Sequence, residues 1–228
     1  MSRMMICSAI ILSALSANTF AREFYLGVGA GPDYAKFQKN AQISQVQNGF
    51  LNFNVKNNDQ VSGTGGFGTI FAGIGNRFPD QHSYLALELN ANRSTARYKM
   101  KNDEYVHSAF ATTTFKMNNA YGLSLIPGLT YQDSTLFYAR LGIARANLKV
   151  SSSDVSLGNG SKDLNGFRWG LGLRQMLGPQ VAVRVEYSHV NYNHLTLSTL
   201  DTNSNTAKST RITPQTNEVE FGLLFLFC

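Results

Sequence analysis

Residues 166–177, which read GFRWGLGLRQML, decide the fold of this chain. Large apolar side chains occupy one parity of the stretch, and arginine and glycine occupy most of the other. Successive side chains of a β-strand point to opposite faces, so the stretch predicts a strand with one apolar face and one small or charged face. A strand of a soluble β-sandwich produces the same pattern, so the rest of the chain must decide between the two.

The same alternation of apolar with small or polar residues recurs along the whole chain. It is least regular around 69–75, where Phe71 falls on the otherwise small and polar parity. The predicted strands lie near 26–31, 69–75, 85–92, 120–125, 137–144, 166–177, 181–188 and 218–227. This pattern predicts eight β-strands in one all-β domain.

The connections between these strands alternate in length. Short turns are expected around 79–80, 127–128 and 178–179, and long polar loops over 38–66, 99–112, 150–165 and 194–214. Short turns at one end and long loops at the other are typical of transmembrane barrels. We therefore expect an eight-stranded antiparallel transmembrane β-barrel with short periplasmic turns, long extracellular loops and both ends of the barrel domain on the periplasmic side.

The N-terminal residues predict a secretory signal peptide. Arg3 is followed by an apolar run over 4–17 and by the small-x-small sequence Thr19-Phe20-Ala21. The run is too short for an ordinary membrane-spanning helix, which needs about 20 apolar residues. We expect a signal peptide over 1–21 and a barrel domain over 22–228. Cys228 is the one cysteine left after such cleavage, which excludes an internal disulfide and a cysteine metal site.

Composition excludes several other classes of protein. No apolar stretch of membrane-helix length follows the predicted leader, which excludes a helical inner-membrane protein. The formal net charge is +6, but no tight Lys/Arg cluster lies on a recognisable helix. We therefore expect the basic residues to contact a phosphate-rich membrane leaflet and not nucleic acid. The sequence has no zinc-protease, nucleophile-elbow or phosphate-loop motif, and it predicts no catalytic, cofactor-binding or metal-binding residue.

Three stretches resemble the small outer-membrane β-barrel superfamily, the group of OmpX, NspA and the OmpA transmembrane domain. They are FYLGVGAG at 24–31, YGLSLIPG at 121–128 and LFYARLG at 136–142. The resemblance covers nearly all of the predicted mature chain and implies a location in the cell outer membrane. The closing segment also resembles the C-terminal signal that the barrel-assembly machinery recognises, which implies that Phe221, Phe225 and Phe227 carry the assembly signal.

An eight-stranded barrel has an interior that side chains can fill. The inward parity of the predicted strands carries charges of both signs, most of them at similar depth: Glu88, Arg140, Arg174, Arg184, Glu186 and Glu220. One interpretation is an ion path or gate. We favour the other, a structural network of ion pairs that fills the lumen, because unpaired charges in so narrow an interior are costly.

Basic side chains cluster where the third and fifth predicted strands leave the membrane. Arg93, Arg97, Arg145 and Lys149 have the outward parity of their strands. The outer leaflet presents lipid A phosphates, for which arginine and lysine are suited. We therefore expect these four residues to face lipopolysaccharide.

Three functions remain open at this point. The first is a structural or surface-exposed, adhesin-like barrel whose extracellular loops bind an outside partner. The second is a narrow, porin-like channel. The third is a lipid A-modifying enzyme, because His189 has the outward parity near the outer leaflet, where lipid A deacylase barrels use outward His and Ser side chains. Asn191 stands where that resemblance requires a serine, so the sequence favours a protein without enzymatic activity.

Overall fold

The computed structural model describes residues 22–47, 50–78, 82–106, 109–132, 134–152, 160–201 and 206–227. The predicted signal peptide and Cys228 lie outside these ranges. All regular structure in the described ranges is β-strand. The strands are β1 (Arg22–Gln47), β2 (Phe50–Arg77), β3 (Ser83–Ser94), β4 (Arg97–Val106), β5 (Ala109–Tyr131), β6 (Thr135–Ser152), β7 (Gly160–Met176), β8 (Val181–Tyr192), β9 (Leu195–Asp201) and β10 (Thr206–Phe227).

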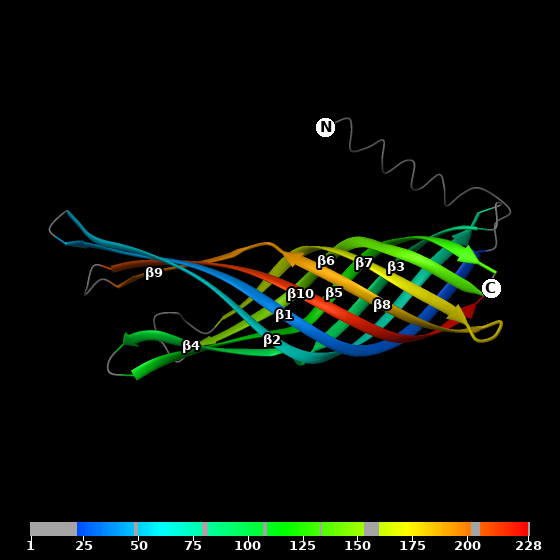
Figure 1. Cartoon of the computed structure of the whole chain (residues 1–228), viewed down its shortest axis with the longest axis horizontal. Helices are drawn as coiled ribbons and strands as arrows, with labels where there is room; N and C mark the ends of the chain where they lie inside the picture. The colour runs from blue at the N-terminus through cyan, green and yellow to red at the C-terminus, as the bar shows by residue number, and fades with distance from the viewer. Residues whose placement is uncertain are drawn as a thin grey trace, which may run out of the picture.

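These strands form one closed antiparallel barrel (Figure 1). Each strand pairs with the next along the wall, and β1 closes the barrel by pairing with β10 from Phe24↔Phe227 to Gln45↔Thr206. Closure leaves no unpaired strand edge in the part of the wall that all strands share, as a membrane interior requires. The predicted all-β barrel is confirmed.

The predicted number of eight strands describes the barrel wall, although the sheet contains ten strands. β3 and β4 both pair with β5, and the register shifts by one residue between Arg93↔Asn119 and Arg97↔Lys116. β8 and β9 both pair with β10, and the register shifts by one residue between Asn191↔Gln215 and Leu195↔Ile212. β4 is therefore the continuation of β3 after a bulge, and β9 is the continuation of β8. Counted in this way, the wall has eight strands.

One of the three predicted short turns is wrong. β5 runs straight through Pro127 and Gly128, and the turn to β6 lies at 132–134, where Gln132 has a φ of 48°. Proline usually marks a turn or an edge because it has no backbone N–H. Here the ladder to β6 skips Pro127 but keeps the same register, with Leu125↔Leu141 before it and Gly128↔Tyr138 after it. The turn around 178–179 is present, and most of the turn around 79–80 lies outside the described residues.

The four predicted long loops are also wrong as loops, because most of their described residues are strand. β1 and β2 stay paired as far as Gln47↔Phe50, and β9 and β10 as far as Asp201↔Thr206. These hairpins project beyond the barrel wall as two sheets, β2-β1-β10-β9 and β4-β5-β6-β7. Figure 1 shows the two sheets as separate groups of strands at the end marked by the labels β9 and β4. The difference in length between the two ends of the barrel is nevertheless as expected.

Candidate functional site

The centre of the lumen is filled by a network of charged side chains, here called the central ion-pair network: Glu88, Arg140, Arg184, Glu186 and Glu220. Glu88 Oε1 lies 2.7 Å from Arg140 Nη2, and Glu88 Oε2 lies 2.8 Å from Arg184 Nη1. Arg140 Nε is also 2.7 Å from Glu186 Oε1, and Arg184 Nη2 is 2.8 Å from Glu220 Oε1. All five side chains are buried, so each arginine joins two carboxylates from different strands across the lumen.

Two tyrosines extend the central ion-pair network, each lying over a glycine. The Tyr25 hydroxyl donates to Glu88 Oε2 at 2.9 Å, and the Tyr138 hydroxyl donates to Glu186 Oε2 at 2.8 Å. Tyr25 pairs across the ladder with Gly73, and Tyr138 with Gly172. A Cβ at either glycine would lie 2.3 Å from the tyrosine ring. The glycines therefore let the rings lie flat along the wall and aim their hydroxyls at the carboxylates.

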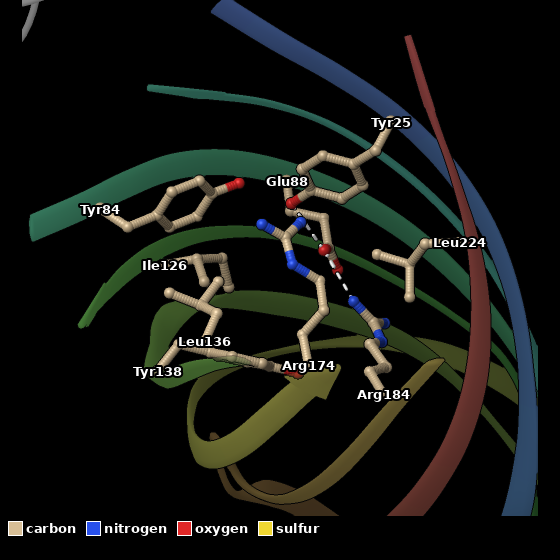
Figure 2. Close-up of a pocket in the computed structure, with 9 residues that line it drawn as sticks. All are labelled: Tyr25, Tyr84, Glu88, Ile126, Leu136, Tyr138, Arg174, Arg184 and Leu224. Atoms are coloured by element: carbon tan, nitrogen blue, oxygen red, sulfur yellow. Dashed lines mark hydrogen bonds and ion pairs between the residues drawn. The ribbon is translucent and has the colours of Figure 1, made fainter. Parts of the chain in front are cut away.

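A separate ion pair fills the lumen toward the short-turn end. Arg174 Nη1 lies 2.7 Å from Glu23 Oε1, and the Tyr84 hydroxyl donates to the same oxygen at 3.1 Å. The Arg174 guanidinium also lies 4.9 Å from the centre of the Tyr84 ring. Figure 2 shows Arg174 between the Tyr84 and Tyr25 rings, with Glu88 and Arg184 beyond it. The cavity among these residues measures about 10 Å³, roughly one water molecule.

A third ion pair lies toward the end with the long hairpins. Arg168 Nη2 is 2.7 Å from Glu218 Oε2 and donates to Ser188 Oγ at 2.9 Å. Asn92 Nδ2 donates to the same Glu218 oxygen at 3.2 Å. Arg168, Glu218, Asn92 and Ser188 are all buried, so the polar filling of the lumen continues beyond the central ion-pair network.

Beyond this third pair the interior becomes apolar. We call this region the apolar cap, and it consists of Ala35, Phe37, Ala96, Phe115, Met117, Ala144, Ala146, Leu148, Leu164, Val190, Tyr192, Leu195 and Ile212. The Phe37 and Phe115 rings stack at a centroid distance of 5.7 Å, and Leu148 is fully buried. The cap joins residues from both projecting sheets, so it covers the mouth of the lumen on the long-hairpin side.

The six charges that the sequence puts on the inward parity are buried in the structure, together with three partners that the prediction does not include. Glu23 binds Arg174 and was overlooked because it lies just before the first recognisable alternation. Arg168 has the inward parity of its strand, and Glu218 is its partner at the start of the closing strand. The sequence does contain a signal for them. Each of the three residues has the inward parity of its strand and lies near one end of the alternating stretch.

The exterior basic residues take different positions. Arg93 and Lys149 are exposed on the outer face, and the side chain of Arg97 lies outside the described residues. Arg145 is exposed but bound, with Nη2 2.7 Å from Asp163 Oδ2. Hydrogen bonds from Asn147 and Arg145 lower the pKa of the Asp163 carboxyl. Arg93 and Lys149 have no ion pair to any described side chain, so they present more open cationic groups than Arg145.

The remaining predicted residues also fall on the outer face. Phe221, Phe225 and Phe227 are exposed along the outside of β10. His189 lies between amides, with Nδ1 2.8 Å from Asn217 Oδ1 and Nε2 3.1 Å from Asn191 Oδ1. In the described part of the chain, no group of three or more His, Cys, Asp and Glu side chains is arranged to hold a metal ion. The same described residues form no helix that is long and apolar enough to cross a membrane.

Three solved structures of outer-membrane proteins are similar to this chain. The outer membrane protease OmpT from Escherichia coli aligns over 93% of this chain and 99% of its own, at 10% identity and a TM-score of 0.53. Neisserial surface protein A aligns over 90% and 97% at 16% identity, with a TM-score of 0.41. Ail, the attachment invasion locus protein of Yersinia pestis, aligns over 86% and 99% at 15% identity, with a TM-score of 0.37.

Family membership comes from the sequence itself. The comparison with curated proteins finds no match. The family model described as the outer membrane protein beta-barrel domain matches residues 7–226, nearly the whole chain. The closed barrel, its apolar exterior and its polar interior agree with that match. The chain belongs to the outer membrane protein beta-barrel domain family and is a protein of the cell outer membrane.

Proposed function

We propose that this barrel is a non-enzymatic surface protein that binds an extracellular partner through its projecting hairpins. The observation that carries the proposal is a contrast within one molecule. The lumen is filled by three sets of ion pairs and covered by the apolar cap. The two projecting sheets, by contrast, end in open strand edges.

The open edges are strands that form backbone hydrogen bonds to a neighbouring strand on one side only. β9 pairs only with β10, and β4 only with β5, among the strands that the structure describes. The part of β2 before Gly66 pairs only with β1, since its ladder with β3 begins at Phe67↔Ser94. Each such edge has backbone N–H and C=O groups pointing away from the sheet, which an extended segment of another protein can pair with.

A shortened hairpin tests the binding function. Asn40 and Asn58 are cross-strand partners, so 41–57 can be removed and the two asparagines joined by an Asn-Gly turn. Immobilised full-length and shortened barrels are compared for binding to host-cell surfaces and matrix proteins. We expect binding to the full-length barrel and at least a tenfold loss in the shortened one. Unboiled samples of both must migrate differently from boiled samples on a gel, which shows that both barrels are folded. Equal binding by both would contradict the role of this hairpin.

A narrow channel is the main alternative function. The conductance of the refolded protein in a planar bilayer distinguishes the two. The described lumen contains cavities of about 10 and 20 Å³, and charges of both signs meet within it. Ions need a continuous wet path. We expect refolded protein in a planar bilayer to give no steps of current above the bare membrane. Reproducible steps that disappear on adding an antibody to the hairpins would favour the channel.

The enzymatic alternative has one testable location. His189 faces outward, whereas the neighbouring Ser188 is buried and accepts a hydrogen bond from Arg168 in the lumen. This serine and histidine therefore lie on opposite faces of β8. We expect lipid A from cells with and without the protein to have identical mass spectra. A missing acyl chain that returns in a His189→Ala strain would contradict the non-enzymatic proposal.

Two further partners concern the insertion and anchoring of the barrel in the membrane and not the binding of an extracellular partner. We propose that exposed Arg93 and Lys149 contact lipid A phosphates and that Phe221, Phe225 and Phe227 are read by the barrel-assembly machinery. The support for the first is their exposure on the outer face near the point where the strands leave the apolar band. The support for the second is an exposed aromatic row on the last strand.

A further inference from the structure

The buried charges of the lumen do not balance. The buried ionisable side chains of the described chain include six carboxylates, Glu23, Asp33, Glu88, Glu186, Glu218 and Glu220. They include four guanidinium groups, Arg140, Arg168, Arg174 and Arg184. The formal charge of the whole chain is +6, so this deficit is specific to the interior. A buried carboxylate without a cation is costly unless it takes up a proton or a positive ion.

One of the two excess carboxylates lies in the central ion-pair network, where three glutamates share two arginines, and the other is Asp33. It is 5% exposed, and no side chain that the structure describes forms an ion pair with it. Its Oδ2 accepts a short hydrogen bond from the Ser94 hydroxyl. Its Oδ1 is buried and has no hydrogen-bond partner. The nearest ion pair toward the lumen, Arg168 with Glu218, is already neutral as a pair.

Asp33 lines a cavity between the third ion pair and the apolar cap. The cavity measures about 20 Å³, enough for a particle of about the size of one water molecule. Eight residues on its wall have oxygen-bearing side chains: Asp33, Asn92, Ser94, Asn118, Asn119, Tyr192, Thr216 and Glu218. The rest of the wall is formed in part by alanine and methionine side chains of the apolar cap.

The chemistry of this wall selects the charge of its occupant. A divalent cation would leave one positive charge uncompensated beside Asp33, and magnesium also keeps several of its own waters, for which about 20 Å³ leaves no room. The wall offers one uncompensated negative charge, because Glu218 is bound by Arg168. We propose that the Asp33 cavity is a binding site for one small monovalent cation, of the class of sodium, potassium or ammonium, held by Asp33 Oδ1 beneath the apolar cap.

The test is the thermal stability of barrels refolded in different salts at one fixed ionic strength. The cation is supplied during refolding and kept in the buffer, so the cavity is in contact with it throughout. Sodium, potassium and ammonium chlorides are compared with choline chloride, whose cation is too large for the cavity. We expect at least one small cation to raise the Tm by about 2–4 °C over choline, with a saturable dependence on concentration.

Two variants separate the site from general screening. Asp33→Asn keeps the shape and the Ser94 contact but removes the charge, so its Tm should be the same in all four salts. Asp163→Asn removes an exposed carboxylate and should keep the cation dependence of the parent. A second measurement uses crystals grown with rubidium or thallium chloride, where an anomalous peak is expected beside Asp33.

The proposal has clear failures. A parent barrel with the same Tm in choline and in every small-cation salt overturns it, and Asp33 is then protonated or merely hydrated. Retention of the full cation dependence by Asp33→Asn also overturns it. Because the parent series stands without any variant, the test does not depend on Asp33→Asn folding well.

Discussion

Along a single strand, the apolar side chains lie on the outer face in the membrane-spanning part of the wall and on the inner face in the projecting hairpin. We call these the lower and the upper part of the strand. In the lower part of β6, Ile143 is 65% exposed on the outer face while Arg140 is buried in the lumen. In the upper part of the same strand, Leu148 is buried inside and Lys149 is exposed outside. Alternation continues without a break in either part. What changes is the surrounding medium, from lipid to water.

The same inversion occurs on β7 and β1. Phe167 is exposed and Arg168 buried in the lower part of β7, whereas Leu164 is buried and Asp163 exposed above them. On β1, exposed Val28 gives way to buried Phe37. A barrel in lipid places its apolar side chains outside, and a pair of sheets in water packs them inside. The position of the inversion therefore marks the outer boundary of the membrane.

The largest effect is expected in the central ion-pair network. Glu88→Ala removes one of the two carboxylate partners of both Arg140 and Arg184 and the acceptor of the Tyr25 hydroxyl, so three buried donors lose their acceptor. We expect the free energy of unfolding to fall by about 3–5 kcal/mol. Urea unfolding of barrels refolded in lipid vesicles measures it, with exposed Lys149→Ala as the control. A loss below about 1 kcal/mol would mean that the network contributes little and would reopen the channel interpretation.

The inversion itself is tested by one substitution made at two heights of β7. Leu171 and Asn165 are both exposed on the outer face, but Leu171 lies in the apolar band and Asn165 near its upper boundary. Leu171→Arg should cost about 2–4 kcal/mol, since arginine then faces the middle of the bilayer. Asn165→Arg should change the free energy of unfolding by less than about 0.5 kcal/mol. Equal costs at the two positions would refute the proposed boundary.

A smaller loss is expected when the apolar cap is weakened. Leu148 is fully buried in the cap, so Leu148→Ala should lower the free energy of unfolding by about 2–3 kcal/mol. Ile143→Val, which trims a lipid-facing side chain of the same strand, is the matched control and should cost less than about 0.5 kcal/mol. Urea unfolding in vesicles compares the two. The comparison fails if Leu148→Ala proves as mild as the control, because the upper interior would then be open to water.

The smallest effect on folding is expected on the outer basic residues. Arg93→Gln should leave the free energy of unfolding within about 0.5 kcal/mol while reducing the lipopolysaccharide that copurifies with the barrel. Arg145→Gln should reduce it less, because Arg145 is already bound to Asp163. Lipopolysaccharide per barrel is measured by its phosphate and sugar content. The same amount in the parent and in Arg93→Gln would remove Arg93 from the proposed contact.

Acid pH should reduce the difference between Arg93 and Arg145 in how much lipopolysaccharide each retains. Hydrogen bonds from Asn147 and Arg145 lower the pKa of the Asp163 carboxyl, so the pair persists as pH falls until that lowered pKa is reached. Below it, Asp163 is neutral and Arg145 is released. Lipopolysaccharide retention by Arg145 should then approach that of Arg93 when binding is measured at acid pH. Unchanged relative retention across this range would contradict the competition between Asp163 and phosphate.

The barrel was predictable because its alternation is strongest where lipid is outside. Leu171 beside Gly170 and Arg140 beside Leu141 assign both faces without knowledge of partners. The sequence predicts loops where the hairpins lie because their buried apolar residues, such as Leu164 and Ile212, are sparse and have the opposite parity to the lipid-facing residues of the same strands. Glu218 was left out of the lumen because its partner Arg168 lies on another strand, and pairing across a barrel depends on a register that one sequence does not state. Pro127 misled for a local reason, since the flanking ladder holds it in a strand.

The seam between β1 and β10 has a consequence for biosynthesis. It joins residues near the two ends of the barrel domain, from Phe24↔Phe227 onward, so it closes the longest loop in the molecule. A chain that stops before β10 leaves the backbone edges of β1 and β8 unpaired, and lipid cannot satisfy them. A prematurely terminated copy therefore has no stable place in the bilayer, so only a chain translated through β10 can complete the barrel.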